Sequence, residues 1–99
     1  MIEFNILIGT AYFNQPFVNI PVLYNANFPG HGAALSVYLG DWGVNLIHAT
    51  INRNANPNHT PRIMMNIEYN NWVQENHHIG EELIITILNE EFPNSILIA

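Results

Sequence analysis

The chain has 99 residues and a net charge of −6, with two arginines and no lysine against eight acids. So few cations exclude a surface for the phosphate backbone of nucleic acids, and the acidic balance disfavours an anionic membrane surface. No apolar run approaches the ~20 residues that span a bilayer, and the absence of cysteine excludes disulfides and thiolate metal sites. We therefore expect neither nucleic-acid binding nor membrane insertion.

Length and composition predict one domain, residues 1–99, that buries about 60 to 65% of its unfolded surface. Sixteen asparagines are spread along the chain, and asparagine disfavours helices and supplies turns. An amide-rich surface of low charge suits neutral polar ligands, although an AT-rich genome would give the same bias. The first residues lack the basic region of a classical signal peptide, so we expect a cytoplasmic protein or one secreted by another route.

The first half of the chain shows short runs of β-forming residues separated by turn residues. Pro21 interrupts one run, which places that strand at an edge or a bulge. Residues 25–32 predict a loop, and Gly40-Asp41-Trp42-Gly43 predicts a turn in which Trp42 folds over the protein. In the strand after this turn we expect Val44, Leu46 and Ile47 to face inward. The predicted strands are residues 3–8, 11–13, 17–24, 33–39 and 44–52.

The second half begins with a loop at residues 52–61, and a strand of period-two alternation follows from Arg62 to Ile67. A turn at residues 69–71 would lead to Trp72 near the corner of a second strand. The later predicted strands are residues 82–88 and 95–99, with a turn at residues 89–92. Residues 81–91 are also compatible with a helix, but their β-branched side chains favour a strand.

About eight short strands at intervals of roughly 8 to 12 residues indicate an all-β domain, either a two-sheet sandwich or a barrel. No stretch combines helical periodicity with helix caps. No internal repeat or linker divides the chain.

Polar residues occur in three segments of the second half: at alternate positions of residues 48–52, at the end of residues 64–66, and after Trp72 in residues 72–77. Their order resembles the galectin carbohydrate-recognition domain. That family carries His-x-Asn-x-Arg on one strand, Val-x-Asn on the next, and Trp-Gly-x-Glu-x-Arg after the following turn. The matching segments here are His48-Ala49-Thr50-Ile51-Asn52, Met64-Met65-Asn66 and Trp72-Val73-Gln74-Glu75-Asn76-His77. His48, Asn66, Trp72 and Glu75 agree with the family, whereas Thr50, Asn52, Val73 and His77 replace Asn, Arg, Gly and Arg.

The resemblance covers roughly residues 17–99. Residues 34–40 are similar to the family's preceding strand, and Asn89-Glu90-Glu91-Phe92 is similar to a segment of nematode-type members. The chain ends before the strands with which a galectin finishes both sheets. The resemblance implies a galectin-type jelly-roll β-sandwich of two antiparallel sheets, which binds β-galactoside glycans as a lectin without metal or cofactor.

The resemblance also assigns roles to single residues. Trp72 would stack beneath the apolar face of galactose. His48 and Asn66 would bind the axial hydroxyl, and Glu75 would accept hydrogen bonds from hydroxyls. His77, which replaces the family's arginine, offers fewer donors.

The resemblance also implies that Asn52, at the position of the family's arginine, belongs to this carbohydrate site, and strand parity adds Arg62 as a further candidate. Arg62 shares parity with Asn66, whereas Arg53 has the opposite parity from His48 and would need a bulge to join the site. We therefore prefer Arg62 to Arg53.

Other interpretations of the same residues stay open. On position alone, Trp72 fits the cap of a core edge as well as it fits a stacking platform, and His48 fits a structural hydrogen-bonding role. Five histidines lack metal-ligand spacing, and neither serine has a nucleophile-elbow context, so we expect neither a metal site nor an enzyme.

The alternative function is a sugar-binding-defective domain that presents an acidic, amide-rich face to a protein partner, in the manner of an inhibitor or immunity protein. Strand edges left unpaired by the early end of the chain invite a second chain. A homodimer is therefore a further hypothesis.

Overall fold

A hairpin of β3 (Ala34–Leu39) and β4 (Leu46–Asn52) forms the centre of the structure, a computed structural model that describes residues 2–88 and 94–99. The predicted turn between these strands is confirmed. Gly40 and Gly43 adopt φ angles of 86° and 80° there, a left-handed backbone that favours glycine.

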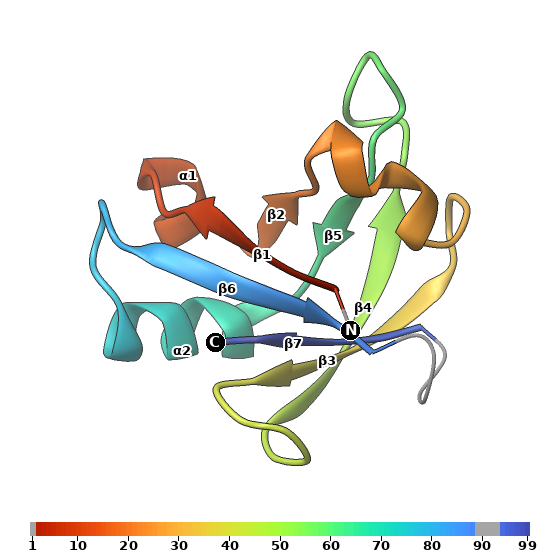
Figure 1. Cartoon of the computed structure of the whole chain (residues 1–99). Coiled ribbons are helices and arrows are strands. Elements are labelled where there is room, and N and C mark those ends of the chain that lie inside the picture. Colours follow the sequence, from red (N-terminus) through yellow and green to blue (C-terminus); the bar gives the residue numbers. More distant parts are fainter. Residues whose placement is uncertain (1, 89–93) are drawn as a thin grey trace.

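Seven strands of the described residues form one sheet in the order β1-β6-β7-β3-β4-β5-β2. Neighbouring strands are antiparallel except β3 and β7, which are parallel. The sheet curls, so that its two ends, β1 and β2, lie on the same side of the molecule (Figure 1). The remaining strands are β1 (Ile2–Leu7), β2 (Phe17–Asn19), β5 (Arg62–Met64), β6 (Glu82–Ile87) and β7 (Ser95–Ile98).

Within residues 2–88 and 94–99, three helical segments accompany the sheet. A short helix, α1 (Thr10–Asn14), connects β1 to β2, and a 3-10 helix, η1 (Val22–Asn27), leads from β2 toward β3. The longest, α2 (Ile67–Asn76), follows β5 and contacts α1.

The core lies on the concave face of the curled sheet, because alternate side chains of each strand point there. Tyr69 and Val73, one helical turn apart on α2, are fully buried against it. Burying a side chain of this size contributes about 1.5–3 kcal/mol, so the α2 contact is a substantial part of the fold's stability. The strand residues of this core are Phe4, Ile6, Val18, Leu35, Val37, Leu39, Ile47, Ala49, Ile51, Ile63, Leu83, Ile85, Ile87, Ile96 and Ile98.

The strand predicted after residue 67 is wrong, because this segment is α2. The side chain of Asn66 accepts a hydrogen bond from the backbone N–H of Glu68 at 3.0 Å, which caps the helix. Tyr69 and Val73 repeat at helical spacing, and Glu68 places a negative charge in the first turn. The cap and the apolar stripe outweigh the low helix propensity of the asparagines.

The strand predicted at residues 11–13 is also wrong, since Tyr12 and Phe13 belong to α1. Residues 17–24 divide at Pro21 into β2 and η1 rather than forming one strand. The fold is therefore rich in strands but not all-β. The predicted turn at residues 89–92 lies outside the described residues.

Two antiparallel sheets were expected, and the described strands instead form one mixed sheet. β7 runs parallel to β3, pairing Val37 with Ile96 and Leu39 with Ile98. The inward prediction for β4 is partly wrong, because Ile47 is buried whereas Val44 and Leu46 are exposed. Since side chains alternate along a strand, an error of one residue exchanges the two faces.

Candidate binding surfaces

The predicted carbohydrate residues of β4 and β5 share the convex face of the sheet but have separate partners. His48 is exposed opposite Ser36. The Oδ1 atom of Asn52 accepts the backbone N–H groups of Asn54 and Ala55, at 2.9 and 3.1 Å, and so shapes the turn after β4. Asn52 is also the register partner of Arg62, so the structure brings these two together.

The predicted residues of α2 lie apart from that face. Asn66 uses its side-chain oxygen to cap the helix, and Glu75 is exposed near the helix end. Among the described residues, neither side chain forms a hydrogen bond or ion pair with His48. The four residues that match the galectin motif therefore have different structural positions, on β4, at the start of α2 and along α2.

Trp72 and His77 form the second predicted pair that the structure brings together. Their ring centroids lie 5.4 Å apart in an edge contact, and Trp72 is half-buried against the core. The Nδ1 atom of His77 lies 2.9 Å from Oε1 of Glu81. The pKa of Glu81 is lowered, first by the backbone N–H of His78 and then by His77. Trp72 thus caps an edge of the core, as one of the two interpretations expected.

The two arginines differ in how many hydrogen bonds their side chains donate within the protein. Arg53 donates five hydrogen bonds, to acceptors on Asn25, Phe28, Pro29 and His59. It therefore ties the end of η1 to the loop after β4.

Arg62 donates only from Nε, to Oδ1 of Asn19 at 2.9 Å, in the hydrogen bonds recorded for the described residues. Its guanidinium carbon lies 4.2 Å from the centre of the Phe17 ring. No carboxylate of the described residues lies within ion-pair distance of it. Its two Nη groups are therefore available to a ligand.

An apolar band crosses the convex face of four adjacent strands. Leu46 on β4 pairs with Tyr38 on β3, which pairs with Leu97 on β7, and Ile84 on β6 lies diagonally beyond Leu97. The ring of Trp42, in the hairpin turn, lies 4.5 Å from the ring of Tyr38. We call these residues the outer band: Tyr38, Trp42, Leu46, Ile84 and Leu97.

Three residues of the outer band are exposed, while Tyr38 and Leu97 between them are half-buried. Leu46 is 44% exposed, and Trp42 and Ile84 are each 40% exposed. This surface was not predicted from the sequence, because Leu46 was expected to face the interior. The alternation of side chains along β4 could have indicated this surface. Leu46 lies two residues before the exposed His48 and therefore on the same face, whereas the buried Ile47 lies on the opposite face.

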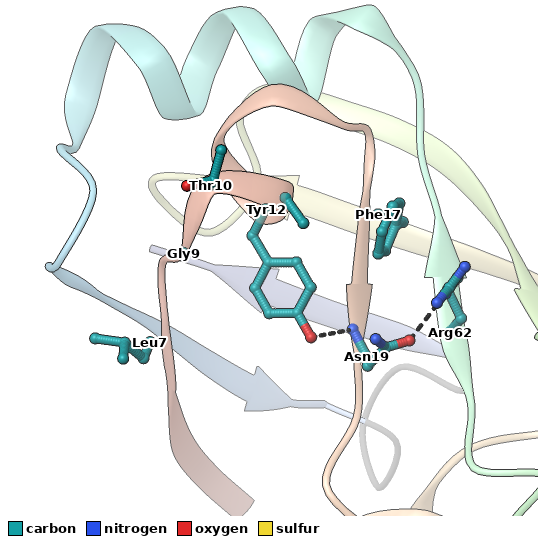
Figure 2. Close-up of a pocket in the computed structure, with 8 residues that line it drawn as sticks. Leu7, Gly9, Thr10, Tyr12, Phe17, Asn19 and Arg62 are labelled. Atoms are coloured by element: carbon teal, nitrogen blue, oxygen red, sulfur yellow. Dashed lines mark hydrogen bonds between the residues drawn. The ribbon is translucent and has the colours of Figure 1, made fainter. Parts of the chain in front are cut away.

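A groove of about 480 Å³ opens between α1 and the strands on either side of it. The ring of Tyr12 extends from α1 into the space between β1 and β2, and its hydroxyl accepts the backbone N–H of Asn19 at 3.2 Å (Figure 2). Phe17 and Arg62 form the wall on the far side. Tyr12 and Phe17 were not predicted as site residues, because both were expected to lie in ordinary strands.

The described residues contain no group of three or more histidine, cysteine, aspartate or glutamate side chains that could hold a metal ion. In the same part of the chain, no helix is long and apolar enough to cross a membrane.

No protein-family model matches the chain, and no curated protein or solved structure is similar enough to count as a match. The galectin relationship therefore remains a hypothesis based on the residues quoted above.

Proposed function

We propose that the protein is a protein-interaction domain, whose outer band binds a partner with apolar side chains flanked by basic ones. The observation that carries the proposal is the continuity of the band across β4, β3, β7 and β6. When a sheet buries one face in its core, its other face is commonly polar. Single exposed apolar residues are ordinary, but a contiguous exposed group is typical of an interaction surface.

The composition of the outer band supports the same function. Tyrosine and tryptophan are enriched among the residues that dominate binding energy at protein interfaces. Tyr38 and Trp42 support each other at the hairpin end of the band, and Leu46 and Ile84 extend it with aliphatic surface.

Charge indicates the kind of partner. Asp41 adjoins Trp42, Glu82 lies two residues before Ile84, and Glu3 is paired with Thr86 on the same face. The chain's two cations lie elsewhere, with Arg53 after β4 and Arg62 opposite Asn52 at the far end of β4 from Leu46. A partner with lysine or arginine around an apolar centre would complement this acidic rim.

The competing hypothesis is the galectin-type lectin with two antiparallel sheets. Its support is the order of His48, Asn66, Trp72 and Glu75 in the sequence. The geometry supports it less, since Asn66 caps α2 and Trp72 packs at a core edge. We therefore prefer the interaction domain.

A photo-crosslinking amino acid at position 46 tests the interaction proposal in the cells that make the protein. Position 67 provides the matched control, because Ile67 is 67% exposed on α2, outside the band. We expect a partner crosslinked from position 46 and not from position 67, with basic residues around its crosslinked site. The same products from both positions, or a partner surface without basic residues, would overturn the proposal.

A further inference from the structure

We propose that the groove between α1, β1 and β2 binds a monocarboxylate that carries an apolar group, with Arg62 as the anchor for the carboxylate. This site is separate from the outer band and does not depend on the proposed function. The groove lies where the sheet fails to close, since β1 and β2 are the two ends of the strand order and do not pair with each other.

The guanidinium of Arg62 is held in place before any ligand arrives. Its Nε group donates to Asn19, whose Oδ1 atom also accepts from Nδ2 of Asn56 at 3.0 Å. One face of the guanidinium lies over the Phe17 ring. A planar guanidinium fixed in this way loses little freedom when it binds a carboxylate, and its two Nη groups can each donate one hydrogen bond.

The contrast with Arg53 shows that this availability is particular to Arg62. Arg53 directs its Nε and both Nη groups to acceptors within the fold. The Nη groups of Arg62 have no recorded acceptor among the described residues, although the chain has eight acids. In the part of the chain that the structure describes, this guanidinium has no acidic partner and the lining of the groove contains no acid, so the site is complementary to an anionic ligand.

The side chains that line the groove indicate which group the ligand carries beside its carboxylate. Tyr12 and Phe17 lie edge to face with ring centroids 5.9 Å apart, and Leu7 and Ala11 add aliphatic surface. Tyr12 projects between the strands toward Asn19, and Phe17 lies beside Arg62 (Figure 2). The charged anchor therefore lies next to an apolar surface that would bind an aromatic or branched side group.

The single positive charge of Arg62 in this groove suits a ligand with a single negative charge. A phosphate or a nucleotide would place two or more charges against the single arginine of the groove, in a protein whose net charge is −6. A volume of about 480 Å³ is in the lower part of the usual range for small-ligand sites, which suits a ligand of modest size. Both a free aromatic acid and the C-terminal residue of a peptide have this chemistry.

The test is a titration of the isotope-labelled protein by heteronuclear NMR with N-acetyl-phenylalanine, and in parallel with its C-terminal amide. We expect saturable shifts of Tyr12, Phe17, Asn19 and the Arg62 side chain with the acid, at a millimolar dissociation constant. The uncharged amide should bind at least about tenfold more weakly, since it loses a charge-assisted pair of hydrogen bonds. Equal binding of acid and amide, or no shifts in the groove, would overturn the proposal.

Two variants separate loss of the site from loss of the fold. Arg62→Gln should weaken N-acetyl-phenylalanine about 10- to 100-fold while the rest of the spectrum stays unchanged. Arg62→Lys keeps the charge but not the planar, two-donor geometry of the guanidinium. Its affinity for N-acetyl-phenylalanine should therefore lie between that of the native protein and that of Arg62→Gln. Unchanged affinity in a folded Arg62→Gln protein would refute the anchor.

A tetrapeptide that ends in phenylalanine with a free carboxylate distinguishes the two ligand sources. Tighter binding than N-acetyl-phenylalanine identifies a peptide C-terminus as the ligand, because residues before the last one then add contacts. Equal affinity identifies a free small acid.

Discussion

The indole of Trp72 lies so close to the backbone of Gly40 that a methyl group built on the glycine would stand 3.2 Å from Nε1. This contact joins α2 to the end of β3. Gly43, three residues later, has a similar φ of 80° but no atom within 4 Å of such a methyl group. Both glycines therefore need a left-handed backbone, but only Gly40 also packs against the indole of Trp72.

Alanine at each glycine separates these effects. Gly43→Ala should lower the free energy of unfolding by about 1 kcal/mol, the usual cost of a left-handed backbone for a residue with a Cβ. Gly40→Ala should cost at least about 1 kcal/mol more, because the indole must also move. Urea unfolding of both variants measures the difference, and equal losses would show that the Trp72 contact does not constrain the hairpin.

The two arginines should differ in their effect on stability. Arg53→Met removes five hydrogen bonds made from the loop after β4, four to residues 25–29 and one to His59, so we expect a loss of about 2–4 kcal/mol in the free energy of unfolding. Arg62→Met removes one hydrogen bond and one ring contact and should cost less than about 1.5 kcal/mol. Thermal or denaturant unfolding of both variants measures these losses. A larger loss of stability for Arg62→Met than for Arg53→Met would contradict this expectation.

Tyr69 links α2 to α1, because its buried hydroxyl donates to the backbone oxygen of Tyr12 at 3.1 Å. Tyr69→Phe should cost about 1 kcal/mol at pH 7. Burial, with a smaller contribution from Tyr12, raises the pKa of Tyr69 above its usual range. The unfolded chain therefore releases this proton first, and stability falls as the pH rises above about 10. The advantage of tyrosine over phenylalanine should shrink between pH 7 and pH 10.5, and a constant difference would count against this account.

Glu81 should give the opposite pH dependence. Its pKa is lowered by the N–H of His78 and by His77, so the folded state favours the charged carboxylate. This contribution is present above the usual glutamate value of about 4.3 and is lost as the pH falls through the lower folded value. Glu81→Gln should therefore unfold more easily than the native protein at pH 6, and this difference should shrink as the pH falls below the usual glutamate value. Glu82→Gln, at the exposed neighbouring position, serves as the control and should change little over this pH range.

Most of the sheet could be predicted from alternation and turn residues. The strands at β1, β3, β4, β6 and β7 follow from β-forming runs bounded by glycine, asparagine or proline, which are local signals. The parallel pairing of β7 with β3 could not be predicted, because strand order depends on contacts between distant segments. The faces of β4 were misassigned for a local reason, since Val44 and Leu46 are apolar yet exposed.

The α2 segment shows why the candidate site was harder to predict than the fold. Ile67, Tyr69, Trp72 and Val73 are β-forming residues, and a motif resemblance placed Trp72 on a strand. The helical spacing of Tyr69 and Val73, together with Asn66 as a capping residue, was the competing signal. Tertiary burial decided between them, and the residues expected to share one groove were separated as a result.

The lectin hypothesis makes its own measurable claim. A titration with lactose, followed by tryptophan fluorescence, should show no saturable change if Trp72 is only a core-edge residue. A saturable change that Trp72→Ala abolishes, in a variant that remains folded, would favour carbohydrate binding over our proposal.

The most direct measurement of the central claim is the dissociation constant of the purified partner for three forms of the protein. These forms are the native chain, Leu46→Asp in the outer band, and Ile67→Asp on the exposed face of α2. Leu46→Asp should raise the dissociation constant at least about 30-fold, the effect of losing a central interface residue worth about 2 kcal/mol, and Ile67→Asp should change it less than about twofold. Equal effects of the two substitutions, or no effect of Leu46→Asp, would contradict the assignment of the outer band as the binding surface.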